Sequence, residues 1–381
     1  MASDGTSPGS APTAPARLNR LDVLRAIAIL LVLGRHVYFN AFWMRIGWMG
    51  VDLFFVLSGF LVTGLLLSEQ RRKGRMNPVR FWLRRGFKIY PPFYALLIVS
   101  AIAGFHQPGN VLADVFFFQN FVPGWWHHAW SLAIEEHFYF LMPAVLVLLA
   151  RGRAGEADPF KRLPLIVAAV AVVSLALRIA LLPFGPPPGD PHFLLRHAYA
   201  TPLRMDGLAF GAFISYCTHY RKAAFAALDR SRLLLLAAAS LLLFIPCTFA
   251  DPDHSPGLVT FGLTALYLAF GGLLVVVLRW PAAARPSRAA ELLAGALGYV
   301  GRHSYSIYLW HLPVMLVAER AFARLWPHAR DQVIFLVYAP VSIALGIVFA
   351  KIIELPTLRL RDRLLPSQAR AVEAPAAPAA G

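Results

Sequence analysis

The sequence predicts an all-helical membrane protein, a polytopic bundle of about ten transmembrane helices with both termini cytoplasmic. Three observations support this fold class. Of the 381 residues, 58% are hydrophobic and only 15% are charged, whereas soluble domains carry about 25% charged residues. Apolar stretches of about 20 residues, the length that crosses a bilayer, recur along the chain. The connections between these stretches alternate between rich and poor in Lys and Arg.

The apolar stretches give the predicted spans in order. They cover approximately 21–43, 47–68, 88–105, 129–150, 164–184, 197–216, 232–250, 258–279, 296–318 and 331–353. Prolines interrupt the third and the ninth stretch. Residues 111–122 are too short to span and are expected to be re-entrant or to lie at the membrane interface.

The ends of the chain differ in composition from the apolar stretches. Residues 1–16 and 366–381 are small, polar and rich in Pro, which is typical of disordered tails. The first apolar run lacks a small-residue cleavage site and is therefore expected to remain as a helix. These features predict a tail over 1–16, one transmembrane domain over 17–358, and a basic, then disordered tail over 359–381.

The basic residues follow a positive-inside pattern. The connection 69–88 is the richest, and 151–163, 217–232 and 279–302 hold four Lys or Arg each, whereas 106–128 and 251–257 hold none. Topology thus accounts for the formal net charge of +16, and no nucleic-acid partner is expected. Cys217 and Cys247 fall near opposite faces of the membrane and are not expected to pair.

Ionisable residues inside a span are costly and usually face a functional cavity. Arg25 and His36 are eleven residues apart in the first span, three helical turns, so they share one face, with Asp22 close to the same stripe. An Arg at the cytoplasmic mouth suits a phosphate, and a buried His suits proton transfer. The alternatives are snorkelling for Arg25 and an interhelical hydrogen bond for His36.

The second span and the basic stretch after it add further polar candidates. Asp52 is expected to be buried or to lie at the non-cytoplasmic edge of its span, while Ser58-Gly59 favours close helix packing. Arg84, Arg85 and Lys88 fall on about one helical turn. They are either an ordinary positive-inside anchor or a cradle for a polyanion such as the phosphates of coenzyme A.

Later spans carry two adjacent carboxylates and several polar residues. Glu135 and Glu136 point about 100° apart on a helix, so they are not expected to face one site. Glu135 needs a partner within its apolar helix. Arg25 and His36 are candidates, and bonding within its own helix neighbourhood, to Ser131 or Tyr139, is the alternative. The remaining cavity candidates are Ser131, Arg204, Asp206, Tyr305, Tyr308 and His311. Arg204 and Asp206 are alternatively expected to neutralise each other.

Six blocks occur in order between about Leu21 and Glu354: Arg25-(ten residues)-His36, GVDLFFVLSGFLVTGLLL, RFWLRRGFKIYP, WSLAIEEHFYFLMP, RMDGLAFG and SYSIYLWHLPV. Together they resemble the acyltransferase-3 family of membrane acyltransferases, which modify polysaccharides, lipopolysaccharide and macrolide sugars. The resemblance makes His36 the catalytic histidine, Arg25 its paired basic residue and Glu135 the characteristic carboxylate. Lys88 stands where the family commonly has Arg, and His137 where it usually has Gln.

The resemblance implies transfer of an acyl group, above all acetyl from acetyl-CoA, to a hydroxyl of a carbohydrate or glycosylated acceptor. Arg84, Arg85 and Lys88 would hold the donor phosphates. His36 would act as general base or form an acyl-imidazole. Acyl-CoA is then a substrate, and neither a bound cofactor nor a metal is expected. The protein is expected to lie in the bacterial inner membrane. The competing hypothesis is a transporter or flippase of a lipid-linked sugar that uses the same charges.

Overall fold

The computed structural model describes residues 14–104, 106–153, 155–281 and 286–366, and all regular structure in these ranges is helical. Residues 1–13 and 367–381 of the predicted tails lie outside the described residues. The longer helices are α1 (Ala14–His36), α3 (Met49–Lys73), α4 (Pro78–Ala103), α6 (Trp130–Ala150), α7 (Leu163–Leu181), α8 (Thr201–Tyr220), α10 (Arg230–Phe249), α11 (Leu263–Arg279), α12 (Arg288–Arg302), α13 (Ser304–Leu325), α14 (Asp331–Phe349) and α15 (Leu355–Leu364).

Shorter helical segments connect or extend these helices. They are α2 (Ala41–Ile46), α5 (Val111–Val115), α9 (Lys222–Ala226), the 3₁₀ turns η1 (His127–Ala129) and η2 (Leu182–Phe184), and the π-helical turns η3 (Leu195–Tyr199), η4 (Leu258–Gly262) and η5 (Ala350–Glu354). The stretch 111–122, predicted not to span, forms α5 and turns.

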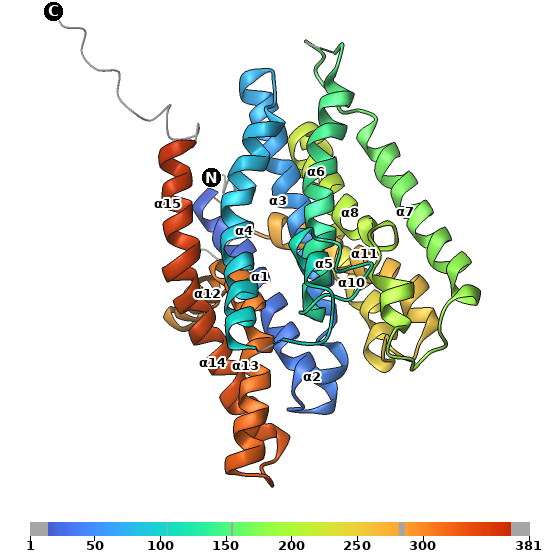
Figure 1. Cartoon of the computed structure of the whole chain (residues 1–381). Coiled ribbons are helices and arrows are strands. Elements are labelled where there is room, and N and C mark those ends of the chain that lie inside the picture. The colour runs from blue at the N-terminus through green and yellow to red at the C-terminus, as the bar shows by residue number, and fades with distance from the viewer. Residues whose placement is uncertain (1–13, 105, 154, 282–285, 367–381) are drawn as a thin grey trace, which may run out of the picture.

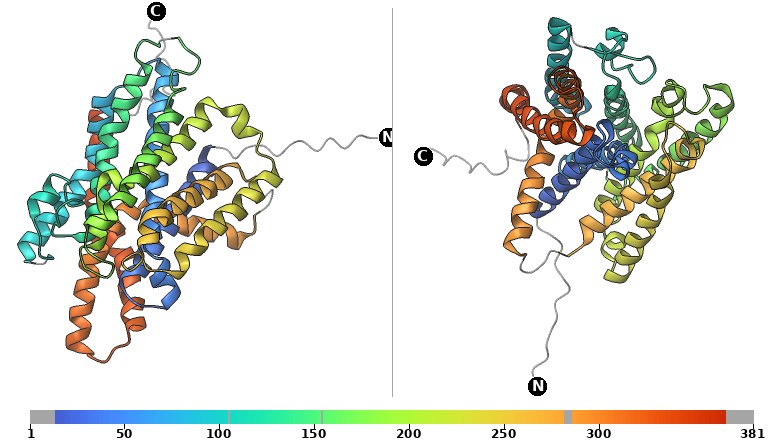
Figure 2. Two further views of the ribbon diagram at one scale, coloured as in Figure 1. Left: turned by 90° about the vertical axis from the view of Figure 1, so that its right-hand side faces the viewer. Right: turned by 90° about the horizontal axis from the view of Figure 1, so that it is seen from below.

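The helices form one bundle. The α3–α4 and α6–α7 connections and α15 lie at one end, while α2 and the α13–α14 connection lie at the other (Figure 1). Seen along the bundle, the N-terminal helices lie near its centre, with α13 to α15 on one side and α7, α10 and α11 on the other (Figure 2). The basic connections 69–88 and 151–163 therefore share one end, which the positive-inside pattern assigns to the cytoplasm.

Seven helical segments in the described ranges are long and apolar enough to cross a membrane: 49–73, 78–103, 127–150, 163–184, 230–249, 258–279 and 331–364. The chain is thus a multi-pass integral membrane protein with the predicted all-α fold. α1, α8 and α13 have comparable lengths of 23, 20 and 22 residues, but they carry several of the ionisable side chains that line the interior. The count of about ten spans stays a prediction, because these three helices are not among the seven.

Some predicted span boundaries were wrong. The predicted span 296–318 is divided at His303 into α12 and α13, and the predicted span 21–43 ends at His36 because α2 begins anew at Ala41. Helical structure also enters both predicted tails, since α1 begins at Ala14 and α15 continues to Leu364. Hydropathy averages over such breaks because the residues on both sides of them are apolar.

Close packing of α3 against α8 sets the centre of the bundle. A Cβ added at Gly59 would lie 1.9 Å from the backbone oxygen of Leu208, and one at Gly211 would lie 2.2 Å from the backbone oxygen of Val56. Because both helices present glycine where they meet, their backbones approach closely, as is common between membrane helices. The predicted packing role of Gly59 is confirmed.

Two buried ion pairs join the helices around this contact. Arg204 of α8 binds Asp52 of α3 at 3.0 Å, and Arg178 of α7 binds Asp206 of α8 at 2.8 Å. All four side chains are at most 5% exposed. The expectation that Arg204 and Asp206 neutralise each other was wrong, because residues two apart on a helix point away from one another and each finds its partner on a different neighbour.

Candidate active site

Three cavities follow one another through the bundle, from the end that holds the α3–α4 connection to the opposite end. We name them the mouth cavity, the inner cavity and the outer cavity. Arg85 and Lys88 line both the mouth and the inner cavity. Val51 and Tyr308 line both the inner and the outer cavity. The three cavities are therefore neighbours in a series, each sharing two lining residues with the next.

The mouth cavity, of about 370 Å³, lies between α3, α4 and α15. Its lining consists of Leu65, Leu66, Glu69, Arg72, Arg80, Phe81, Arg84, Arg85, Lys88, Arg361 and Pro366. Cations dominate this set, and converging Arg and Lys side chains suit a polyanionic ligand. Of the predicted donor residues, Arg84 also donates to Asp362 of α15 at 3.0 Å, so it helps to hold that helix in place.

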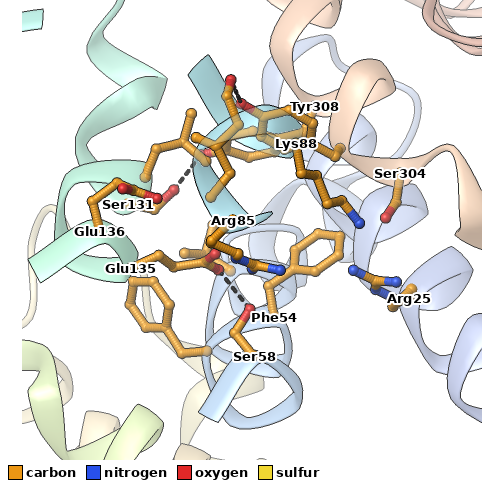
Figure 3. A pocket seen from close by; sticks show the side chains of 15 residues that line it. Arg25, Phe54, Ser58, Arg85, Lys88, Ser131, Glu135, Glu136, Ser304 and Tyr308 are labelled. Atoms are coloured by element: carbon orange, nitrogen blue, oxygen red, sulfur yellow. Dashed lines mark hydrogen bonds between the residues drawn. The ribbon is translucent and has the colours of Figure 1, made fainter. Parts of the chain in front are cut away.

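The inner cavity, of about 50 Å³, lies between α1, α3, α4, α6 and α13. Its lining consists of Arg25, Val51, Phe54, Phe55, Ser58, Arg85, Lys88, Ile89, Ser131, Leu132, Glu135, Glu136, Ser304, Tyr305 and Tyr308. The side-chain nitrogens of Arg25, Arg85 and Lys88 point into the same space as Glu135 (Figure 3). The structure thus brings together four of the predicted charged candidates, Arg25, Arg85, Lys88 and Glu135.

Glu135 is held by hydroxyl groups. Its Oε1 accepts a hydrogen bond from Ser58 of α3 at 3.0 Å, and its Oε2 accepts one from Tyr139, one turn later on α6. Tyr139 in turn accepts from Arg85 at 2.5 Å, and the Arg85 guanidinium lies 4.1 Å from the Tyr139 ring centroid. The expected pairing of Glu135 with Arg25 or His36 was wrong, because α3 and α6 supply nearer donors.

Glu136 lines the same cavity, although the 100° rule predicts that two adjacent residues face different sites. Glu136 is buried at 3% exposure and accepts a hydrogen bond from Tyr90 of α4 at 3.1 Å. The cavity fills the space between α3 and α4, so Glu135 borders its α3 wall and Glu136 its α4 wall. Two adjacent residues of α6 therefore both line this cavity, because it extends from α3 to α4.

Arg25 and Asp22 lie in the N-terminal half of α1. Arg25 lines the inner cavity, while Asp22 lies 3.9 Å from Arg25 and 3.8 Å from Arg302 of α12 and lines none of the three cavities. Tyr305 lines the inner cavity and donates to the backbone oxygen of Ile89 at 2.7 Å, which ties α13 to α4. Asp22, predicted on the same helix face as Arg25 and His36, thus contributes to the packing of α1 against α12.

The outer cavity, of about 330 Å³, lies at the other end of the bundle. Its lining includes His36, Trp48, Gln107, His127, His128, Trp130, Tyr199, Arg204 and Asp253. Trp130 and Tyr199 stack with their ring centroids 4.1 Å apart. Arg25 and His36, predicted on one helix face, therefore border different cavities, since three helical turns separate them along α1.

His36 belongs to a cluster of three imidazoles. His311 of α13 lies between the other two, with ring centroids 5.0 Å from His36 and 4.9 Å from His128. The Nδ1 of His311 lies 2.6 Å from the backbone oxygen of Tyr308. Because a carbonyl oxygen only accepts, Nδ1 carries the hydrogen. The buried Nε2 has no hydrogen-bond partner among the described residues, so it presents a lone pair within the cluster. No metal-binding group of three or more His, Cys, Asp or Glu occurs among the described residues.

An ion pair fixes the rim of the outer cavity beside His36. Arg35 donates to both carboxylate oxygens of Asp251, at 2.8 and 3.1 Å, and to Asp253 at 2.6 Å. Burial opposes ionisation of Asp251, but the hydrogen bonds and the charge of Arg35 outweigh it and hold the pKa of Asp251 at about 2. The carboxylate is therefore ionised at neutral pH, and the pair ties α1 to the 251–257 connection.

Several polar residues of these networks were not predicted as site or pairing residues. Ser58 was assigned to packing, Tyr139 was only an alternative partner, and Arg178 and His128 were not singled out. Arg178 had a usable signal, because it is a cation within an otherwise apolar span. His137, where a Gln is expected, lies 2.6 Å from the Thr201 hydroxyl at the start of α8 and lines none of the three cavities.

Comparisons with known proteins show the family to which the chain belongs. The family described as an acyltransferase domain matches residues 18–353. Over 323 residues the chain is 28% identical to a peptidoglycan O-acetyltransferase, OatA, of Listeria monocytogenes, covering 77% of this chain and 49% of that protein. Over 348 residues it is 27% identical to an O-acetyltransferase, OatA, of Staphylococcus aureus, covering 81% and 52%. A putative peptidoglycan O-acetyltransferase, YrhL, of Bacillus subtilis is 28% identical over 332 residues, covering 78% and 48%.

The chain spans about half the length of these relatives, and no solved structure gives a significant match. The family match extends over nearly all of the bundle, from α1 through α14. It includes every candidate residue discussed above except the α15 side of the mouth cavity. The chain therefore belongs to the acyltransferase-3 family of membrane proteins.

Proposed function

We propose that this protein is a membrane O-acyltransferase that moves an acetyl group from acetyl-CoA, bound on the cytoplasmic side, to a hydroxyl of a carbohydrate on the opposite side. The main observation in support of this proposal is the series of three cavities. It begins at a basic mouth, passes carboxylates and cations, and ends at a histidine cluster. A channel of this polarity joins an anionic donor to a base across the bilayer.

The mouth cavity suits the phosphates of coenzyme A. Arg72, Arg80 and Arg361 stand around Arg85 and Lys88 at its lining, and charge-assisted hydrogen bonds to phosphate are strong. Lys88 reaches both the mouth and the inner cavity. As a single ammonium it provides a point charge, in contrast to the bidentate Arg common in the family. The thioester would then point along the inner cavity toward the outer one.

In the proposed reaction His36 is the general base. It takes the proton of the acceptor hydroxyl as the oxygen attacks the thioester carbonyl. The new ester C–O bond forms and the C–S bond breaks. Coenzyme A leaves as the thiolate and regains a proton from the imidazolium. An acyl-imidazole on His36 is the second route to the same products.

The outer cavity suits a carbohydrate acceptor. It combines the aromatic faces of Trp48 and Tyr199 with polar groups of Gln107 and Asp253, and sites with apolar walls and a few polar groups orient small polar ligands. The names of the matched relatives point to peptidoglycan. We infer an envelope glycan of this type as acceptor and the bacterial cytoplasmic membrane as the location.

The test is release of free coenzyme A by purified protein given acetyl-CoA and a glycan acceptor. Release that depends on the acceptor supports transfer. Movement of a lipid-linked sugar without coenzyme A release contradicts it and favours the transporter hypothesis, which relies on the same buried charges.

Replacing Lys88 with Ala should raise KM for acetyl-CoA about 10-fold, because it removes a cation that would contact phosphate. KM for S-acetyl-pantetheine, which lacks the nucleotide phosphates, should change little. Arg75→Ala is the matched control, since this exposed cation lies at the same end of the bundle and lines none of the three cavities. Equal losses for both donors would show that Lys88 does not bind phosphate.

A further inference from the structure

Two side chains separate the inner cavity from the outer one. Val51 of α3 and Tyr308 of α13 line both cavities, and no other described residue does so. We call this pair the septum. The inner cavity on one side of it measures about 50 Å³, against about 330 Å³ on the other. The septum is therefore the boundary between a narrow compartment and a wide one.

Both side chains of the septum are held in place. The Tyr308 hydroxyl donates to the backbone oxygen of His128 at 2.5 Å. Since a phenol has one hydrogen, the 2.7 Å contact between Tyr308 and Ser131 must be a bond that Ser131 donates. The Phe54 ring also meets the Tyr308 ring edge-on, with centroids 6.3 Å apart. Val51 is branched at Cβ and prefers one rotamer in a helix, so the pair forms a stiff constriction.

The proposed reaction requires a carbonyl group to reach His36 past this constriction. The donor cations lie on the inner side of the septum and His36 lies on the outer side. The acyl group must therefore sit at the septum when the C–O bond forms and the C–S bond breaks. The septum itself neither gains nor loses a bond or a proton.

We propose that Val51 and Tyr308 select the length of the acyl chain and restrict transfer to short groups such as acetyl. This inference rests on the proposed function and restricts the donor to acyl-CoA with a short acyl group. A rigid pocket changes kcat/KM by about 10-fold or more for each methylene by which two acyl groups differ in length. Flexible walls would adapt to a longer chain, but hydrogen bonds and β-branching hold these two.

The test compares acetyl-CoA, propionyl-CoA and butyryl-CoA as donors for wild type and Val51→Ala. The ratio of butyryl to acetyl transfer should rise about 10-fold in Val51→Ala, because the truncated side chain widens the constriction. Val51→Leu should lower propionyl transfer relative to acetyl. Val56→Ala is the matched control, since Val56 is a buried valine of the same helix that lines none of the three cavities.

A second variant guards against loss of folding. Tyr308→Phe keeps the ring but removes both hydrogen bonds, so the ratio should also rise, though less than in Val51→Ala. An unchanged ratio in both variants, or an equal rise in Val56→Ala, overturns the septum proposal. Failure of the proposed function looks different, because wild type would then release no coenzyme A from any of the three donors.

Discussion

Replacing His36 with alanine should lower kcat by about 10² to 10⁴, the usual contribution of a group that transfers a proton in the transition state. His36 borders the outer cavity at the end of α1, where its loss removes no ion pair with any residue that the structure describes. KM for acetyl-CoA should stay near the wild-type value, because the donor cations lie on the other side of the septum. The measurement is coenzyme A release per folded molecule, with the melting temperature as a check on folding.

Two further variants make this result specific. His36→Gln should be as inactive as His36→Ala, because an amide cannot accept the proton. His328→Ala is the matched control, since His328 is exposed in the α13–α14 connection and lines none of the three cavities. Near-normal turnover by either His36 variant at equal protein level would contradict the assignment of His36 as the base.

The fold followed from the sequence because hydropathy and basic charge are one-dimensional signals. Most span boundaries agree with the helices to within a few residues, as for the fourth stretch and α6. The errors occur where packing between helices determines where a helix begins or ends. α4 begins at Pro78, ten residues before the predicted span, because its first turns carry the cations of the mouth cavity and read as a connection. The break at His303 lies between two stretches that are both helical and so leaves no mark in the hydropathy.

The candidate site was predicted as a list of residues but not as an arrangement. The spacing of Arg25 and His36 indicates a shared face, yet it does not reveal that the inner and outer cavities divide that face. Likewise, the carboxylate of Glu135 requires a partner, but the nearest hydroxyls come from α3 and its own helix. Such pairings depend on how distant segments dock, which one sequence does not record.

The partners of the buried cation Arg204 were likewise not predictable from the sequence. Arg204 is isolated in its sequence block from the two residues that define its surroundings, Asp52 and Trp130. In the structure it pairs with Asp52, and its guanidinium carbon lies 5.5 Å from the Trp130 ring centroid. Because Arg204 also lines the outer cavity, this salt bridge forms part of the cavity wall. Arg204, for which the sequence left open a role of only balancing a neighbouring charge, therefore also helps to form the site.

Glu135→Gln should lower kcat/KM about 10²-fold, because it removes the charge of a half-buried, hydrogen-bonded group and leaves its partners imperfectly paired. The carboxylate accepts from two hydroxyls, from Ser58 and from Tyr139. An amide of the same shape offers one accepting oxygen and turns donor hydrogens toward the other hydroxyl. Tyr139, which also accepts from Arg85, would then lose its orientation.

This chain of bonds predicts where the loss appears. Because Glu135 contacts neither His36 nor Arg25 by hydrogen bond among the described residues, its effect should pass through Tyr139 to Arg85 and raise KM for acetyl-CoA as well as lower kcat. A direct role in charging the His36 site, the expectation from sequence alone, would lower kcat and leave KM unchanged. Steady-state kinetics with acetyl-CoA as the varied substrate separate the two.

The double variant Glu135→Gln/Tyr139→Phe provides the decisive comparison. If Glu135 acts through Tyr139, the double variant should be little worse than either single one, since both changes break the same chain. Two independent roles would instead give multiplied losses. A purely structural role predicts a third result, in which kcat/KM per folded molecule stays near the wild-type value while the melting temperature falls. Measuring both quantities on the four proteins therefore distinguishes a positioning carboxylate from one that serves only the packing of α3 against α6.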